Sequence, residues 1–169
     1  MDKFTPSLIP FSGERVEWVI DQSYPTTLRR LRSILHKPSL LKILFFLRLK
    51  DVTGLKTYLN RTAGDLGLMI LGRVPHGRIL GVFGGPHQAQ MFLIGNPLTA
   101  LTMMRVHPEA GVYAPLRVMV SVSDLNKTIV TYDRPSKVFA QWSEPVFDET
   151  GKMLDEKMEA LIRELEFTP

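Results

Sequence analysis

The sequence contains no cysteine, and this absence excludes several classes of site. Without thiolates the chain has no disulfide scaffold, no zinc–thiolate or iron–sulfur centre and no cysteine nucleophile. The absence also fits a reducing compartment. The first residues include no continuous apolar run of the kind that predicts a signal peptide. We therefore expect a cytoplasmic protein.

Long hydrophobic runs are missing as well. The most apolar stretch, residues 40–49, is interrupted by Lys42 and Arg48. A helix that crosses a bilayer needs about 20 apolar residues, so no membrane span is predicted. The phosphate-binding patterns G-x-G-x-x-G and G-x-x-x-x-G-K-[ST] and the catalytic patterns G-x-S-x-G and H-E-x-x-H are also absent from the sequence. No cofactor is evident from sequence motifs.

Charge is spread unevenly along the chain. Residues 1–80 carry 13 Lys or Arg and 6 Asp or Glu, whereas residues 81–169 carry 8 and 11. One interpretation of this distribution is two surfaces of complementary charge that pack together or face water. The other is an N-terminal half that attracts anions. The basic residues are not gathered into dense runs with interleaved aromatic side chains, so nucleic-acid binding is not predicted.

The composition is that of a globular domain, with 44% hydrophobic and 22% charged residues. A chain of 169 residues is long enough to bury a core of its own. We expect an extended arm over residues 1–13, because they contain Pro6, Pro10 and Gly13. A single α+β domain is expected over residues 14–169.

Five segments show the alternation or the short apolar run of a β-strand. A turn at residues 123–127 joins the last two of them as a hairpin. The glycine-rich segment 75–88 is expected to be irregular. The predicted strands are residues 15–21, 68–73, 90–94, 116–122 and 128–132.

Apolar spacing and capping residues predict the helices. Ser39 is a preferred N-cap for a helix over residues 40–50, and we expect this helix to be largely enclosed because it is apolar almost all round. A last helix, about residues 151–166, places Leu154 and Leu165 on one face. The irregular order of strands and helices favours an α+β fold. Further helices are predicted over about residues 24–36, 53–65 and 97–106, with a short turn after residue 135.

A series of short motifs distinguishes residues 94–135. The motifs are I-G-N-P at 94–97, L-T-M-M-R at 101–105, A-G-V-Y-A-P-L-R-V at 110–118 and T-Y-D-R-P at 131–135. This series resembles the family called domain of unknown function 302, in which a G-N-P turn and a helix precede an L-P-like pair and a later T/S-Y-x-x-P strand end. Pro75-His76 stands where that family often has Asp-His, and Ala114-Pro115 replaces Leu-Pro. The longer N-terminal half resembles that of the longer fungal and bacterial members.

The resemblance implies a fold similar to the TATA-binding-protein-like or helix-grip arrangement. In that arrangement a curved antiparallel sheet packs on a long helix, here with extra N-terminal helices. The resemblance also implies a homodimer. It implies no established activity, so it supports the fold prediction rather than a function.

Four residues are candidates for ligand binding. Asn96 suits an N-cap and Pro97 the first helical position, but amides at a helix start also attract carboxylate or phosphate. Arg117 follows the alternation of its strand, so it lies either on the solvated face or over a pocket, where it would bind a carboxylate. Phe45 and Met104 belong to a surplus of soft apolar residues that either fill the core or line an adaptable cavity.

His76 is the candidate general base, because imidazole titrates near neutral pH. Tyr132 either orients a substrate or is a core tyrosine with a satisfied hydroxyl. No two of the four histidines have the spacing of a helical metal motif, and no metal site is predicted. His76 and His87 could meet across the glycine-rich segment, so haem is not excluded.

The leading hypothesis is a small-molecule-binding domain. Its pocket would lie between the curved sheet and the helix at residues 39–50, and its ligand would be largely apolar with one anionic group near Asn96 or Arg117. One alternative is a cofactor-independent isomerase, cyclase or lyase that uses His76 as base. Another is a homodimeric interaction module. Whether the protein is an enzyme stays open.

Overall fold

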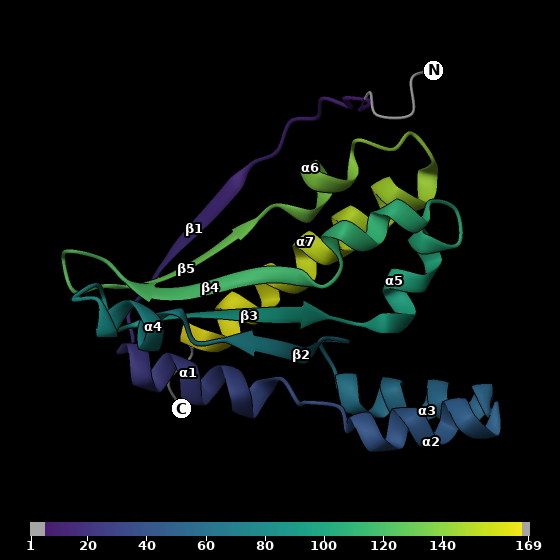
Figure 1. Ribbon diagram of the computed structural model, residues 1–169, viewed down its shortest axis with the longest axis horizontal. Coiled ribbons are helices and arrows are strands. Elements are labelled where there is room, and N and C mark those ends of the chain that lie inside the picture. The colour runs from purple at the N-terminus through teal and green to yellow at the C-terminus, as the bar shows by residue number, and fades with distance from the viewer. Residues whose placement is uncertain (1–5, 167–169) are drawn as a thin grey trace.

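The computed structural model describes residues 6–166 and contains a five-stranded antiparallel sheet (Figure 1). The sheet is open, and the strand order β1-β5-β4-β3-β2 places β1 and β2 at its edges. The predicted α+β class is therefore confirmed. The strands are β1 (Arg15–Ile20), β2 (Met69–Val74), β3 (Ala89–Gly95), β4 (Leu116–Val122) and β5 (Thr128–Asp133).

The chain before β1 has no regular secondary structure from residue 6 to residue 14. This part of the predicted arm is extended, and residues 1–5 lie outside the described residues. The predicted hairpin joins β4 to β5, and β1 adds to the other side of β5 with Arg15 opposite Asp133.

Two helices cover one face of the sheet. They are α1 (Tyr24–Ile34) and the long α7 (Pro145–Glu166). Successive side chains of a strand point to opposite faces of the sheet. Every second strand residue therefore points toward these helices and is buried against their side chains. This core includes Leu31, Phe92, Val118, Val130 and Leu161.

A helical hairpin projects from one end of the molecule (Figure 1). It consists of α2 (Leu40–Leu49) and α3 (Val52–Ala63). The Ser39 hydroxyl accepts a hydrogen bond from the Lys42 amide, as expected of an N-cap. The expectation that α2 is enclosed is wrong, because none of its residues is buried.

The remaining elements lie at the two ends of the sheet. A helix, α4 (His76–Val82), occupies the segment that was expected to be irregular. At the other end, α5 (Pro97–Met104) and a 3₁₀ helix, η1 (Pro108–Tyr113), connect β3 to β4, and α6 (Pro135–Phe139) follows β5. None of the helices within residues 6–166 combines the length and the apolar character that crossing a bilayer requires.

Candidate functional site

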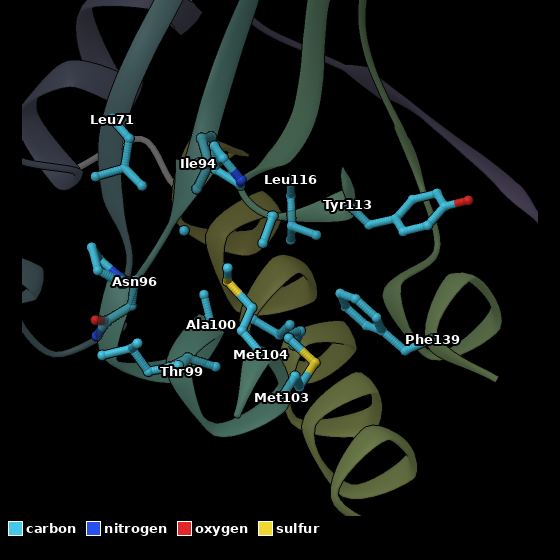
Figure 2. Close-up of a pocket in the computed structure, with 16 residues that line it drawn as sticks. Leu71, Ile94, Asn96, Thr99, Ala100, Met103, Met104, Tyr113, Leu116 and Phe139 are labelled. Carbon is cyan, nitrogen blue, oxygen red and sulfur yellow. The ribbon is translucent and has the colours of Figure 1, made fainter. Parts of the chain in front are cut away.

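A cavity of about 340 Å³ lies where the sheet meets α5 (Figure 2). Seven elements contribute to it: β2, β3, α5, η1, β4, α6 and α7. The lining residues are Leu71, Ile94, Gly95, Asn96, Pro97, Thr99, Ala100, Leu101, Met103, Met104, Tyr113, Ala114, Pro115, Leu116, Phe139 and Leu154.

The sequence sets the position of α5 at the edge of this cavity. Asn96 has the extended backbone of an N-cap, and its side-chain oxygen accepts a hydrogen bond of 2.9 Å from the Leu98 amide. Its side-chain nitrogen donates to the Gly67 carbonyl at 3.3 Å. Pro97 supplies the fixed φ that suits the first helical residue. These contacts tie the start of α5 to the loop before β2.

The inner wall of the cavity is buried and apolar. Ile94, Met103, Phe139 and Leu154 are all buried, so each is held by the core as well as facing the cavity. Leu101, in contrast, is exposed at the rim.

The cavity has no charged residue in its lining. Its polar side chains are those of Asn96, Thr99 and Tyr113. Figure 2 shows Asn96 and Thr99 on one side and Tyr113 on the opposite side, with its hydroxyl directed away from the other labelled residues. Hydrogen bonding to a guest is thus concentrated at the start of α5.

Two of the four predicted ligand-binding residues, Asn96 and Met104, line the cavity. The other two lie elsewhere. Arg117 is on the opposite face of the sheet, where its side chain is 61% exposed and its guanidinium lies 3.8 Å from the Asp133 carboxylate. Phe45 is exposed on α2. The cavity is therefore beside α5 rather than beside the helix at residues 39–50.

The structure does not bring His76 to the cavity. His76 begins α4, at the opposite end of β3 from α5 (Figure 1). The His87 ring lies against the same helix, because a Cβ on Gly81 would fall 2.1 Å from His87 Nδ1. Residues 6–166 contain no group of three or more His, Asp or Glu side chains arranged to hold a metal ion.

Tyr132 belongs to the core rather than to the cavity lining. Its hydroxyl accepts a hydrogen bond of 3.3 Å from the indole nitrogen of Trp18. Burial raises the pKa of Tyr132 above its ordinary value of 10.0, and this effect exceeds that of the Trp18 hydrogen bond, which lowers it. The side chain is neutral at physiological pH.

A polar and aromatic cluster lies next to the cavity and was not anticipated. His107 Nε2 lies 2.8 Å from Glu144 Oε1, and the imidazole stacks against the indole of Trp142. The hydrogen bond from His107 is the main cause that lowers the pKa of Glu144. Trp142 also meets the ring of Tyr113 edge to face, which connects this cluster to the cavity wall.

Sequence reasoning missed most of the lining residues, although a signal for them existed. All of them except Leu71, Phe139 and Leu154 fall within residues 94–116, the segment that carries the family-like motifs. The G-N-P turn and the Ala114-Pro115 pair therefore mark two sides of one cavity.

Comparisons with known proteins agree with this fold. The crystal structure of an uncharacterized conserved DUF302 protein from Bacillus stearothermophilus aligns with a TM-score of 0.62 and 12% sequence identity, over 89% of this chain and 96% of that one. At that identity the likeness establishes the fold alone. Comparison with curated proteins gives no match. Residues 48–165 match the profile of the family described as Domain of unknown function DUF302. Since this match covers more than half of the chain, the protein belongs to that family.

Proposed function

We propose that this protein binds a small, largely apolar molecule that carries one anionic group. The observation that supports the proposal is the cavity of about 340 Å³ beside α5. Ligand pockets in proteins are concave, mostly apolar and about 300–1,000 Å³ in volume, with a few polar groups that fix orientation. The cavity meets each of these descriptions.

The apolar part of the ligand would contact the inner wall. Ile94, Met103 and Phe139 present carbon atoms and a thioether sulfur that accepts hydrogen bonds only weakly, so no strong polar group needs a partner there. Met104 adds a flexible thioether that adjusts to the shape of a guest. An apolar guest in this space gains the free energy of leaving water, about 25 cal/mol per Å² of surface buried.

The anionic group would lie at the start of α5. The first amides of a helix have no acceptor within the helix and carry partial positive charge. Pro97 has no N–H, and the Leu98 amide already donates to Asn96. The Thr99 amide and hydroxyl are then the donors at this edge of the cavity. We assign the anion contact here rather than to Arg117, which faces Asp133 on the other side of the sheet.

The alternative of a cofactor-independent enzyme gains no support from the geometry. Its base, His76, is at the far end of β3, and Tyr132 holds its place in the core through Trp18. A general base needs to reach its substrate directly or through one water. Binding without chemistry is therefore the function that the cavity supports best.

Titration calorimetry with decanoate tests the proposal. We expect one molecule to bind per chain, and decanol, which lacks the charge, to bind more weakly. Replacing Ala100 with Leu places a larger side chain in the cavity and should weaken binding by at least about tenfold. Ala140→Leu is the matched control, because Ala140 is exposed and does not line the cavity.

Two results would contradict the proposal. One is equal decanoate binding by the Ala100→Leu variant and the unmodified chain. The other is the absence of any bound small molecule in native mass spectra of freshly purified protein together with no binding of decanoate. Thermal unfolding of both variants establishes that each is folded, and Ala100→Met offers a smaller change if Leu is not tolerated.

A further inference from the structure

The surface of α2 is an exposed apolar ridge. Leu41 is 79% exposed and Leu44 51% exposed, although both are large aliphatic side chains. Single exposed apolar residues are common, but a contiguous set of them marks an interaction surface. The ridge is defined by the exposed residues Leu40, Leu41, Leu44, Phe45, Leu47, Leu49 and Val52.

The protein's own fold uses only the inner side of α2. Phe46 meets Tyr58 of α3 with ring centroids 5.9 Å apart, and Ile43 packs against a small cluster that includes Leu59 and Met69. No other described element covers the outer side, as Figure 1 shows for the hairpin at the end of the molecule. The ridge therefore has no partner within residues 6–166.

The helical hairpin that carries the ridge is rich in basic residues. Residues 40–63 contain five Lys or Arg and one acidic residue, Asp51. The Asp51 carboxylate already accepts a hydrogen bond of 2.8 Å from the Gly54 amide as the N-cap of α3. No ion pair within residues 6–166 joins these cations to a carboxylate. The basic residues are Lys42, Arg48, Lys50, Lys56 and Arg61.

We infer that the α2 ridge docks this protein on an anionic lipid surface. Leucine and phenylalanine side chains with flanking Lys and Arg are the chemistry of helices that lie in the plane of a membrane interface. The apolar side chains enter the boundary between headgroups and acyl chains, while the cations meet anionic headgroups. With ten residues, α2 is far too short to span a bilayer and would lie along its surface.

Charge favours a lipid surface over a second copy of the chain. In a two-fold contact each surface patch meets itself, so the surplus of cations around one ridge would face the same surplus around the other. Like charges placed opposite one another disfavour association. A lipid surface instead supplies negative charge, and its fluid interface needs no groove shaped to receive a projecting helix.

Co-sedimentation of the full chain with vesicles tests this inference. Vesicles of phosphatidylcholine with phosphatidylserine should bind the protein, and vesicles of phosphatidylcholine alone should bind it at least about tenfold more weakly. Replacing Leu44 and Phe45 together with Ser should abolish sedimentation with anionic vesicles. Val82→Ser with Phe83→Ser is the matched control, since these residues on and after α4 are 82% and 84% exposed.

A charge-reversed pair separates the electrostatic contribution. Lys42→Glu with Arg48→Glu should weaken binding to anionic vesicles by at least about tenfold. The exposed residues Arg29 and Lys127, also changed to Glu, are the control at the same net charge. Rising salt should weaken binding of the unmodified chain, because screening shortens the reach of the cations.

Several outcomes would overturn the inference. They are equal binding to neutral and anionic vesicles, equal losses in the α4 control, or no vesicle binding at all. A dimer in light scattering that becomes a monomer on Leu44→Ser with Phe45→Ser, without vesicle binding, would assign the ridge to a second copy. The inference does not depend on the cavity, so the Ala100→Leu variant should sediment with anionic vesicles like the unmodified chain.

Discussion

The indole Nε1 of Trp18 donates a hydrogen bond of 3.3 Å to the hydroxyl of Tyr132, from edge strand β1 to its neighbour β5. The two residues are diagonal neighbours on the sheet face that α7 covers, since Val16 is directly opposite Tyr132 and Trp18 is opposite Val130. This contact gives the Tyr132 hydroxyl a structural role, and it permits a direct test of that role against a catalytic one.

The first prediction concerns Tyr132→Phe. Loss of this hydrogen bond should lower the free energy of unfolding by about 0.5–1.5 kcal/mol and leave decanoate binding unchanged, because Tyr132 does not line the cavity. Urea unfolding followed by fluorescence measures the first effect and calorimetry the second. A large loss of ligand affinity with unchanged stability would support the functional role instead.

Tyr132 also gives the stability a dependence on alkaline pH. Burial raises its folded pKa above 10.0, so the folded state holds the proton more tightly than the unfolded chain. The contribution of protonated Tyr132 to the free energy of unfolding is complete below pH 10.0, and it is lost as pH rises through the folded pKa. The Tyr132→Phe variant should show a shallower loss above pH 10, and Tyr24 and Lys152, whose pKa values are also raised, contribute to the loss that remains.

The second prediction concerns acid stability and Glu144. The hydrogen bond from His107 lowers the folded pKa of Glu144 below its ordinary value of 4.5. The contribution of ionised Glu144 to the free energy of unfolding is then complete above pH 4.5, and it is lost as pH falls through the lowered pKa. Glu144→Gln should flatten this part of the stability curve when thermal unfolding is followed from pH 7 to pH 3. The exposed Glu149→Gln is the control, and an equal flattening there would contradict the assignment.

The third prediction concerns Gly151, within α7. Alanine in the middle of a helix is normally about 1 kcal/mol better than glycine. Here a Cβ on residue 151 would fall 2.7 Å from the Cα of Ser136 in α6, so one of the two helices must move. We expect Gly151→Ala to destabilise the protein by about 1–3 kcal/mol in urea unfolding. Gly13→Ala, where no atom lies within 4 Å of the added Cβ, should be neutral.

The elements that the sequence predicts well are those whose signals are local. The buried face of α7 follows from the helical spacing of Leu154, Met158 and Leu165, and the β4–β5 hairpin follows from two short runs separated by turn residues. The prediction began α7 at residue 151, whereas the helix begins at Pro145. Pro145 at the first helical position and Asp148 in the first turn are local signals of this earlier start.

Two errors have the same physical origin, because each depends on whether another segment of the chain packs against the helix. An all-round apolar pattern predicts an enclosed helix only if the enclosing partner belongs to the same chain, and for α2 no described segment fills that role. The glycines of α4 weaken helix propensity. However, Gly77 allows that helix to lie against the backbone of His87, where a Cβ would fall 2.1 Å from the carbonyl oxygen. Neither the missing partner of α2 nor this contact of α4 is visible in a sequence window.

The candidate site was predictable only where its residues belong to a local sequence pattern. Asn96 and Met104 belong to one turn and helix, whose pattern is local, and both line the cavity. Phe139 and Leu154 reach the cavity from elements that follow β5, and their apolar character is shared with every other core residue. No spacing rule singles them out, so the position of the cavity emerges only from the assembled fold.

The fourth prediction concerns Asn96 and separates its role as the N-cap of α5 from its proposed role in ligand binding. Asn96→Ala removes the acceptor of the Leu98 amide and should destabilise the protein by about 1 kcal/mol, whereas Asn96→Asp retains a capping oxygen and should cost less. Urea unfolding measures both effects. Asp also loses the donor to the Gly67 carbonyl, so a residual cost is expected.

Ligand binding should respond to the same two variants in the reverse order. An aspartate at residue 96 would place negative charge at the start of α5, where the carboxylate of decanoate is proposed to bind. Like charges repel, so Asn96→Asp should weaken decanoate binding more than Asn96→Ala does, although it is the more stable variant. Decanol carries no charge and should lose little affinity with Asp. If both ligands lose affinity in proportion to the loss of stability, Asn96 serves only to cap its helix, and the anionic group of the ligand lies elsewhere.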